Sequence, residues 1–319
     1  MRTFFLFLFV TFAHAYLRAQ EINNYSTLFD VRDSSFTRIS YDNDLLSFRG
    51  TDRYYTQGIG IDVFSDKLNK NPLNVILFRL KNSDRSNFGI EFRTHGCTPR
   101  TILSDSVLIG DRPFSGVFSL GVVRTSHQTE RRLRLVSQFE LGMIGPAALG
   151  EEIQTGIHKI TGDDLPLGWQ HQIKNAPIVN TTLRLESTSP FPIPGLFMTS
   201  IYGQVKLGTF QTNLSGGFEF SIGKRNSAML MKKHRLEYYV YSQSSATAVA
   251  YDASLMGGII NRDGYSLKYS ELNALVVRQH LGFVFAMQHF SIAFDWAFIS
   301  PEIKEGLPHN WGGLRLTFY

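Results

Sequence analysis

The sequence predicts an all-β protein: a transmembrane antiparallel β-barrel of about twelve strands, with a short helical segment in an outer loop. Three observations support this fold class. Apolar and polar residues alternate with a period of two along most of the chain, as in 290–298. Aromatic residues make up 13% of the chain, and charged residues make up 18%, below the roughly 25% of soluble domains. The mean hydropathy of −0.09 suits a wall whose side chains alternate between lipid and lumen.

The N-terminal segment predicts export. Arg2 precedes an apolar run, and small residues follow at Ala15 and Ala19. This order of charge, apolar core and cleavage site is typical of a secretory signal peptide. We therefore expect a signal peptide over 1–19 and a single barrel domain over 20–319. The apolar run is shorter than the roughly 20 residues of a transmembrane helix, and no later stretch is long and apolar enough for one. If the protein is bound in a membrane, we therefore expect it to span that membrane with strands.

The period-two runs place the expected strands in order along the chain. They cover 36–47, 54–65, 87–98, 113–125, 131–143, 175–188, 196–209, 213–222, 233–250, 270–286, 288–299 and 309–319. An even count returns both termini to the periplasmic side, as in bacterial barrels. The segment 66–86 is long for a periplasmic turn, and its stretch NVILFRL fits either a short helix or an extra strand. A soluble β-sandwich is the alternative fold, but it would bury its apolar faces between two sheets.

The segment 150–162, GEEIQTGIHKITG, is a polar, helix-like piece within this run of strands. Its spacing puts Gln154 and His158 on one helix face. Its three isoleucines form an apolar stripe, which we expect to dock the helix. A barrel needs no such helix to stand in a membrane, so the segment indicates a function, with His158 as a candidate base. The simpler alternative for His158 is an ordinary loop histidine.

The first outward connection of the predicted barrel is also polar. The cluster Asp42-Asn43-Asp44 ends the first strand, and antiparallel pairing is expected to put Asn43 and Asp44 across from Tyr55 and Thr56. Residues of this kind near a strand end are often only turn-formers.

Two further polar segments belong to the next outward connections. Arg100 and Arg112 flank the connection between the third and fourth strands, and Asp163 and Asp164 follow the helical segment. Each could be a surface charge. Together they place a base, hard oxygen ligands and two arginines on one outer rim. Carboxylate and carbonyl oxygens favour Ca²⁺ or Mg²⁺, the histidines lack zinc-like spacing, and no GxSxG elbow supports a serine hydrolase.

The charge of the chain and its single cysteine argue against a nucleic-acid-binding protein and against a disulfide-stabilised fold. The net charge is +5, with no Lys/Arg block and no nucleic-acid motif, so nucleic acid is not an expected partner. The single cysteine, Cys97, cannot form an internal disulfide. A small buried residue explains it better than a nucleophile, because no thiolate-stabilising setting is visible.

Ordered blocks in the first two-thirds of the chain resemble the outer-membrane lipid A deacylase family. The blocks are YDND, TDRYYTQG, TP, DRPFSG, GMIGPAALGEEIQTGIH and GWQHQIKN. The resemblance implies a twelve-stranded barrel and a calcium-dependent esterase that removes the 3′-acyloxyacyl chain of lipid A. It also implies a histidine that activates water directly, similar to secreted phospholipase A2.

The resemblance assigns roles to individual residues. His158 would be the general base and Gln154 its same-face partner. Asn43 and Asp44 match the family's Asn-Asp pair, with Asp44 as a calcium ligand. Thr56 matches the hydroxyl residue opposite this pair.

The chain also departs from the family's pattern. Asp164 stands where the family can carry a glutamate ligand, which puts a calcium ligand with a shorter carboxylate at this position. The family's basic substrate residues do not align cleanly, so Arg100 and Arg112 are the substrate-binding candidates. Around the family's NEP motif the chain has Asn175-Ala176-Pro177, which offers no carboxylate.

The expected protein is a monomer in the bacterial outer membrane, with its site at the outer-leaflet rim and lipid A or lipopolysaccharide as its partner. Two alternatives stay open. One is a serine-type outer-membrane phospholipase, although its family's His-Asp-Ser-Asn-Gly run is missing. The other is a non-enzymatic barrel that serves as a pore, adhesin or structural anchor.

Overall fold

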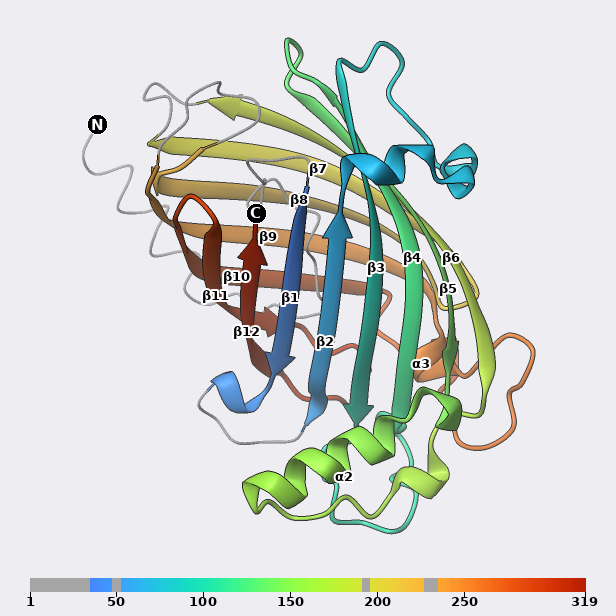
Figure 1. The fold of residues 1–319 in the computed structure, drawn as a ribbon. Helices are drawn as coiled ribbons and strands as arrows, with labels where there is room; N and C mark the ends of the chain where they lie inside the picture. The colour runs from blue at the N-terminus through green and yellow to red at the C-terminus, as the bar shows by residue number, and fades with distance from the viewer. Residues whose placement is uncertain (1–34, 48–52, 191–195, 227–234) are drawn as a thin grey trace, which may run out of the picture.

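The strands of the computed structural model close into an antiparallel barrel (Figure 1). The structure describes residues 35–47, 53–190, 196–226 and 235–319. In this part of the chain the strands are β1 (Phe36–Asn43), β2 (Tyr54–Phe64), β3 (Arg85–Thr98), β4 (Ser115–Gln128), β5 (Leu133–Ile144), β6 (Ala176–Pro190), β7 (Phe197–Gly208), β8 (Gln211–Lys224), β9 (Glu237–Asp252), β10 (Leu275–Ala286), β11 (Phe290–Ile299) and β12 (His309–Phe318). Each strand pairs with its sequence neighbours, and β1 closes against β12. The predicted fold class is confirmed, whereas the expected signal peptide lies outside the described residues.

Among the strand boundaries that differ from the prediction are the end of β1 and the start of β10. β1 ends at Asn43, before a 3-10 turn over Leu45–Ser47, so the expected strand end at residue 47 was wrong. β10 begins at Leu275, after a 3-10 turn over Tyr269–Glu271, and not at residue 270.

The connection between β2 and β3 contains two 3-10 helices, Asp66–Lys70 and Pro72–Ile76, and no extra strand among its described residues. The side chain of Asn71 accepts the N–H of Leu73 at 3.0 Å, and proline follows it at the first helical position. This combination of cap and proline favours a helical start. The short-helix alternative is therefore the correct one.

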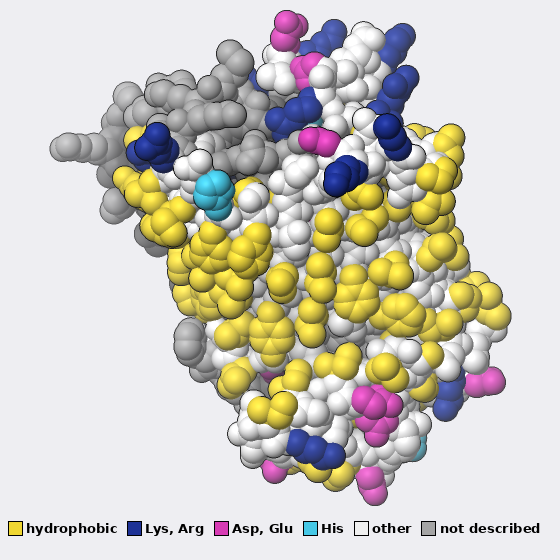
Figure 2. Space-filling view, in the orientation of Figure 1, with side chains coloured by type: hydrophobic (Ala, Val, Ile, Leu, Met, Phe, Trp, Pro, Cys, Tyr) yellow, Lys and Arg dark blue, Asp and Glu magenta, His cyan; other side chains and the backbone are white. Residues whose placement is uncertain are grey.

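The outward faces of the strands form an apolar belt. Side chains that alternate outward are exposed, namely Ile39, Ile61, Ile90, Leu120, Leu141, Val179, Leu185, Ile201, Leu207, Leu214, Phe218, Leu281 and Phe283. Figure 2 shows a band of apolar side chains around the middle of the visible face, with charged residues gathered beyond both of its edges. The band is the surface that lipid covers in a transmembrane barrel.

The inward faces are polar and largely paired. Buried Arg184 bonds Glu186 at 2.6 Å and Glu219 at 2.5 Å. Arg93 pairs with Glu91 at 2.9 Å and also with Asp62. Buried charges are tolerated when they are paired and hydrogen-bonded. The period-two pattern of the sequence therefore separates a lipid-facing side from a lumen filled with ion pairs.

Two helices occupy connections at one end of the barrel in the described part of the chain. Helix α2 (Gly150–Thr161) follows β5, and the short α3 (Ala253–Met256) follows β9. The connections β1–β2 and β3–β4 reach this same end, called here the α2 end (Figure 1). In the residues described, no helix is both long and apolar enough to span a membrane.

Candidate functional site

Helix α2 lies across the ends of β3 and β4 and turns a polar face to the wall (Figure 1). Gln154 and His158 are buried on this face, one helical turn apart. The helix ends at Thr161, and its C-cap Gly162 has a φ of 82° and donates its N–H to the carbonyl of His158 at 2.8 Å. A left-handed glycine of this kind is a common helix stop. The predicted helix and the shared face of Gln154 and His158 are thus confirmed.

The docking face of α2 was predicted incorrectly. Ile160 is 87% exposed, and Ile153 and Ile157 are only half-buried. The buried face is instead the one that carries Gln154 and His158. The reason lies in the wall beneath the helix. Its glycines allow the helix to come close, and its hydroxyl group forms a hydrogen bond with a polar side chain but not with an apolar one.

A β-bulge in β2 supplies that hydroxyl group. The register of β2 against β3 shifts between Tyr55 and Gln57. Tyr55 packs against Trp311 in a buried cluster, whereas Thr56 accepts a hydrogen bond at Oγ1 from Gln154 Nε2 at 3.1 Å. Bulges near functional sites often redirect a side chain in this way. Here the bulge aims Thr56 at α2.

Asn43 joins the same group from β1. Its Nδ2 donates to the backbone carbonyl of Thr56 at 2.7 Å, and its Oδ1 accepts the N–H of Leu45 at 2.7 Å. The strand ladder pairs Asn43 with Gln57. The sequence predicted that Asn43 and Asp44 would lie across from Tyr55 and Thr56, so the observed register is shifted along β2 from the predicted one. Even so, the structure brings together Asn43, Thr56 and Gln154, which are far apart in the sequence.

Trp169 completes this group and was missed by sequence reasoning. Its indole Nε1 donates to Gln154 Oε1 at 2.8 Å, and its ring is tilted against that of Phe114, with the ring centroids 5.0 Å apart. Because an indole only donates, the oxygen of Gln154 must face Trp169 and its NH₂ group must face Thr56. The block GWQHQIKN was a signal for this residue, but nothing in it points to the partner.

Three glycines allow the close approach of helix and wall. A Cβ on Gly116 would lie 3.0 Å from the Cα of Gly150, and a Cβ on Gly150 would lie 2.7 Å from the ring of Trp169. On Gly96 a Cβ would lie 3.1 Å from the methyl group of Thr56. Alternation along β3 puts Gly96 on the face opposite Glu91 and Arg93, whose buried ion pair faces the lumen. The group around Gln154 therefore stands on the outward face of the wall, beside the apolar belt.

The ring of His158 is fixed by the loop that follows α2. Its Nδ1 lies 2.5 Å from the backbone carbonyl oxygen of Asp164. A carbonyl can only accept, so Nδ1 carries the proton and Nε2 is the basic nitrogen of the neutral ring. This geometry suits a general base, and it gives Asp164 a backbone role that the sequence did not predict.

The expected metal ligands are only partly assembled. Asp44 is 3% exposed at the end of β1, and its carbonyl accepts bonds from Ser47. The side chain of Asp164 is exposed. In the described ranges no three His, Cys, Asp or Glu side chains gather at one metal position. Asn43, the chain neighbour of Asp44, contacts the backbone carbonyl of Thr56. Carboxylate and neutral oxygens of this kind are the ligand types that Ca²⁺ prefers.

The two arginines have different surroundings. The side chain of Arg100 is 56% exposed, and its Nε lies 3.3 Å from Asp111. Arg112 has a side chain only 2% exposed, which bonds Glu302 at 2.5 Å and Ser254 at 2.7 Å. The structure thus ties Arg112 to the β11–β12 connection and α3 and does not bring it together with His158. Its guanidinium is buried and so needs a carboxylate partner, whereas Arg100 stays on the surface.

Comparison with known proteins gives a family and a fold. A family model described as "Outer membrane protein LpxR" matches residues 4–319. A search of curated proteins finds no match. Among solved structures, LpxR from Salmonella typhimurium has a TM-score of 0.72 at 20% identity, over 89% of this chain and 100% of that chain.

Other barrels are more distant. The β domain of the Bordetella autotransporter Brka has a TM-score of 0.47 at 10% identity, over 89% of this chain and 98% of that one. The NanC porin has a TM-score of 0.40 at 6% identity, over 89% of this chain and 99% of that one. At these identities the likenesses concern the fold alone.

Proposed function

Because the LpxR model matches almost the whole chain, this protein belongs to the LpxR outer membrane protein family, and we propose that it is a lipid A deacylase. The proposed reaction is hydrolysis of the ester that holds the 3′-acyloxyacyl chain of lipid A. It depends on Ca²⁺ and uses His158 to activate water. The substrate is lipid A or lipopolysaccharide in the outer leaflet, and the enzyme acts as a monomer.

The observation that carries this proposal is the position of the polar face of α2. Gln154 meets Thr56 at 3.1 Å on the outward side of the wall. A site on this side faces the lipid, whereas a site for a soluble substrate would more naturally face the lumen or the solvent. A glycolipid could keep its acyl chains in the membrane and present one ester to His158.

In the proposed mechanism, the neutral ring of His158 takes a proton from water at Nε2 while the water oxygen attacks the ester carbonyl. The same proton then goes to the leaving alkoxide, which gives a free acid and an alcohol. The bond from Nδ1 to the carbonyl of Asp164 keeps the ring in the required tautomer. Gln154 orients groups and does not transfer the proton, since Trp169 and Thr56 already occupy its oxygen and its NH₂ group.

Asp44 would hold the calcium ion, with oxygens of Asn43, Thr56 and Asp164 assisting. When bound, calcium supplies positive charge that polarises the ester carbonyl and stabilises its oxygen as negative charge develops. The exposed Arg100 is the arginine that could reach a phosphate group of the substrate, because its guanidinium points to the surface. Arg112, held by Glu302, is better explained as a structural residue.

Mass spectrometry of lipid A tests the function directly. Cells that produce the protein should contain lipid A lighter by the mass of the 3′-acyloxyacyl chain, and cells without it should not. Unchanged lipid A, with the folded barrel present in the outer membrane, would contradict the proposal. Single-channel conductance without ester hydrolysis would favour the pore alternative.

Trp169→Phe is expected to lower the rate of hydrolysis about tenfold. The change leaves Gln154 Oε1 buried without its donor, at a cost of roughly 1–3 kcal/mol, and frees the amide to rotate away from Thr56. The control is Trp296→Phe, the same change on β11, which is four strands away from β3 around the barrel. If Trp169 acts through Gln154, the double variant Trp169→Phe/Gln154→Ala should be no slower than Gln154→Ala alone. Fully additive losses would exclude a positioning role.

A further inference from the structure

The connection between β2 and β3 lies against the outside of the barrel, at the end away from α2. Its backbone is tied to β5, where the hydroxyl group of Ser137 accepts the N–H of Phe78 at 2.9 Å. The next residue on β5, Gln138, bonds Glu91 in the lumen, so Ser137 faces outward. The second 3-10 helix of the connection, Pro72–Ile76, packs against β4 (Figure 1). The connection therefore covers part of the outer face of the wall.

Two arginines meet where this connection crosses the wall. Arg124 lies on β4 directly opposite Ser137, and Arg79 lies one residue beyond the N–H that bonds Ser137. Arg79 is exposed, and its charge repels that of Arg124. Arg124 donates to Ser86 at 3.2 Å and lies over the ring of Phe88 at 5.1 Å. Among the described residues its buried Nε has no hydrogen-bond partner, and neither arginine pairs with a carboxylate.

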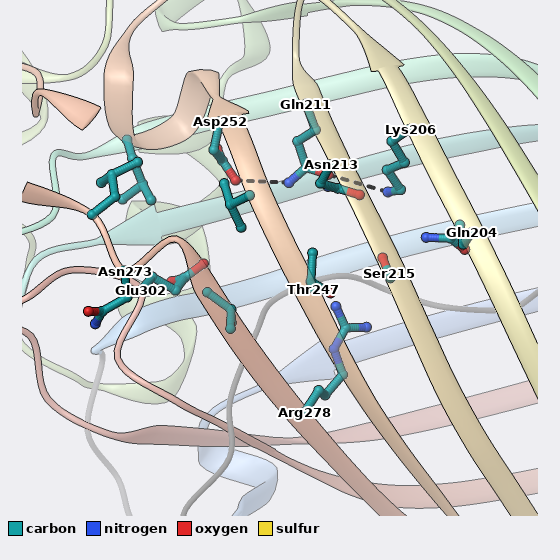
Figure 3. A pocket seen from close by; sticks show the side chains of 14 residues that line it. Gln204, Lys206, Gln211, Asn213, Ser215, Thr247, Asp252, Asn273, Arg278 and Glu302 are labelled. Carbon is teal, nitrogen blue, oxygen red and sulfur yellow. Dashed lines mark hydrogen bonds between the residues drawn. The ribbon is translucent and has the colours of Figure 1, made fainter. Parts of the chain in front are cut away.

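Cations that face the lumen, in contrast, have partners within the barrel. Buried Arg93 and Arg184 each pair with carboxylates. Figure 3 shows Lys206 in the lumen, where it donates to Gln211 at 3.3 Å, and Gln211 donates to Asp252 at 3.0 Å. A cation beside a low-dielectric surface needs an opposite charge close to it. Because the outward pair of arginines has none from the described chain, it favours an anion from outside the protein.

The surroundings of the two arginines are both apolar and basic. Four apolar side chains of the connection are exposed, namely Leu73, Val75, Ile76 and Phe78. Three of its lysines are exposed as well, namely Lys67, Lys70 and Lys81. Figure 2 shows Lys and Arg side chains gathered beyond the edge of the apolar belt at the end away from α2. Exposed apolar groups next to basic ones are typical of a segment at the surface of a membrane.

The position of this surface in the barrel indicates which anion is available there. β1 begins and β12 ends at the end away from α2, which is the periplasmic end of bacterial barrels. The leaflet on that side of the outer membrane consists of phospholipids, whose phosphate groups lie at the edge of the apolar belt. The planar guanidinium group matches the geometry of phosphate oxygens.

We propose that Arg79 and Arg124 bind the phosphate group of an anionic phospholipid in the periplasmic leaflet, with Ile76 and Phe78 against its acyl chains. The nearby lysines disfavour a headgroup that carries an ammonium group, so phosphatidylglycerol fits better than phosphatidylethanolamine. The inference does not rest on the esterase proposal, because this surface and His158 lie at opposite ends of the barrel.

Native mass spectrometry of the full-length protein tests this proposal, with the protein released from non-ionic micelles that contain phosphatidylglycerol or phosphatidylethanolamine. The wild type should retain one phosphatidylglycerol at least about tenfold more tightly than phosphatidylethanolamine. Arg79→Gln and Arg124→Gln should each weaken that binding about tenfold or more, because hydrogen bonds between charged groups are lost. The matched control is Arg131→Gln, which removes the same charge from an exposed residue of the β4–β5 turn at the same end. It should bind as the wild type does.

Two further variants complete the test. Arg79→Glu covers the case in which Arg124→Gln does not fold, because it places a carboxylate beside Arg124 and should leave a folded barrel that no longer retains phosphatidylglycerol. Phe78→Asn keeps both arginines and should weaken the binding of phosphatidylglycerol, whereas a site for free phosphate would be unaffected by it.

Inorganic phosphate is the competing probe, and millimolar concentrations should not displace the lipid from the wild type. Displacement by phosphate together with an unaffected Phe78→Asn variant would indicate a site for a free anion and would overturn the proposal. Equal retention of the two phospholipids, no retention of either, or unaffected arginine variants would also overturn it.

Discussion

His158→Asn is expected to lower the rate of lipid A ester hydrolysis by a factor of about 10²–10⁴, the usual effect of removing a general base. Asparagine fits the buried position and can still donate to the carbonyl of Asp164, so the barrel should fold. It has no basic nitrogen in place of Nε2, so it cannot take the proton from water. The measurement is the release of 3′-linked acyl chains by purified protein in mixed micelles.

His289→Asn is the matched control, because His289 is exposed in the β10–β11 turn at the other end of the barrel. It should retain full activity. Gln154→Ala should lose less than His158→Asn, since Gln154 orients and does not transfer the proton. If His158→Asn released acyl chains at near the wild-type rate, the mechanism would be wrong, and the family membership would still hold.

The barrel could be predicted from the sequence because each strand carries its own signal. On β7, for example, Lys206 is buried in the lumen and Leu207 is exposed to lipid. This alternation depends only on adjacent residues, so it is visible without knowledge of the strand's partners. The helix was visible for the same reason, since the spacing of Gln154 and His158 is a local property.

The surroundings of the candidate site could not be predicted, because they depend on contacts between distant segments. The bulge between Tyr55 and Gln57 exists only in the pairing with β3, and a shift of one residue reverses which face a side chain occupies. The bond from Trp169 to Gln154 depends on how the loop after α2 folds back. The pattern of isoleucines on α2 suggested the wrong docking face. Apolar periodicity describes the helix alone and contains no information about the glycine and threonine residues of the wall that the helix packs against.

Asp164 and Arg112 illustrate a second limit of sequence reasoning. Both were selected for the charge of their side chains. Asp164 contacts His158 through its backbone carbonyl, and Arg112 is held in a buried pair with Glu302. The type of a residue alone does not show whether its charge binds a metal ion or substrate or forms a structural ion pair. The burial of its side chain and the identity of its hydrogen-bond partner do show this.

Removal of calcium is expected to abolish hydrolysis, and Asp44→Asn is expected to raise the Ca²⁺ concentration needed for half-maximal activity at least about tenfold. Within the described residues Asp44 has no second and third acidic side chain beside it to share a metal ion. A site built from one buried carboxylate and neutral oxygens should lose most of its affinity with that charge. EDTA followed by a calcium titration measures both effects.

Calcium binding can also be followed without activity, as a rise in the unfolding temperature with added Ca²⁺. That rise should be present in the wild type and much smaller in Asp44→Asn. Asp163→Asn is the matched control, because Asp163 is exposed and its carboxylate bonds Thr161.

Asp164→Asn separates the two roles of Asp164: it keeps the backbone carbonyl on His158 and removes only the carboxylate. A normal calcium requirement in Asp164→Asn would restrict this residue to orienting His158. Full activity of the wild type in excess chelator would remove calcium from the mechanism and leave His158 to activate water without a metal ion.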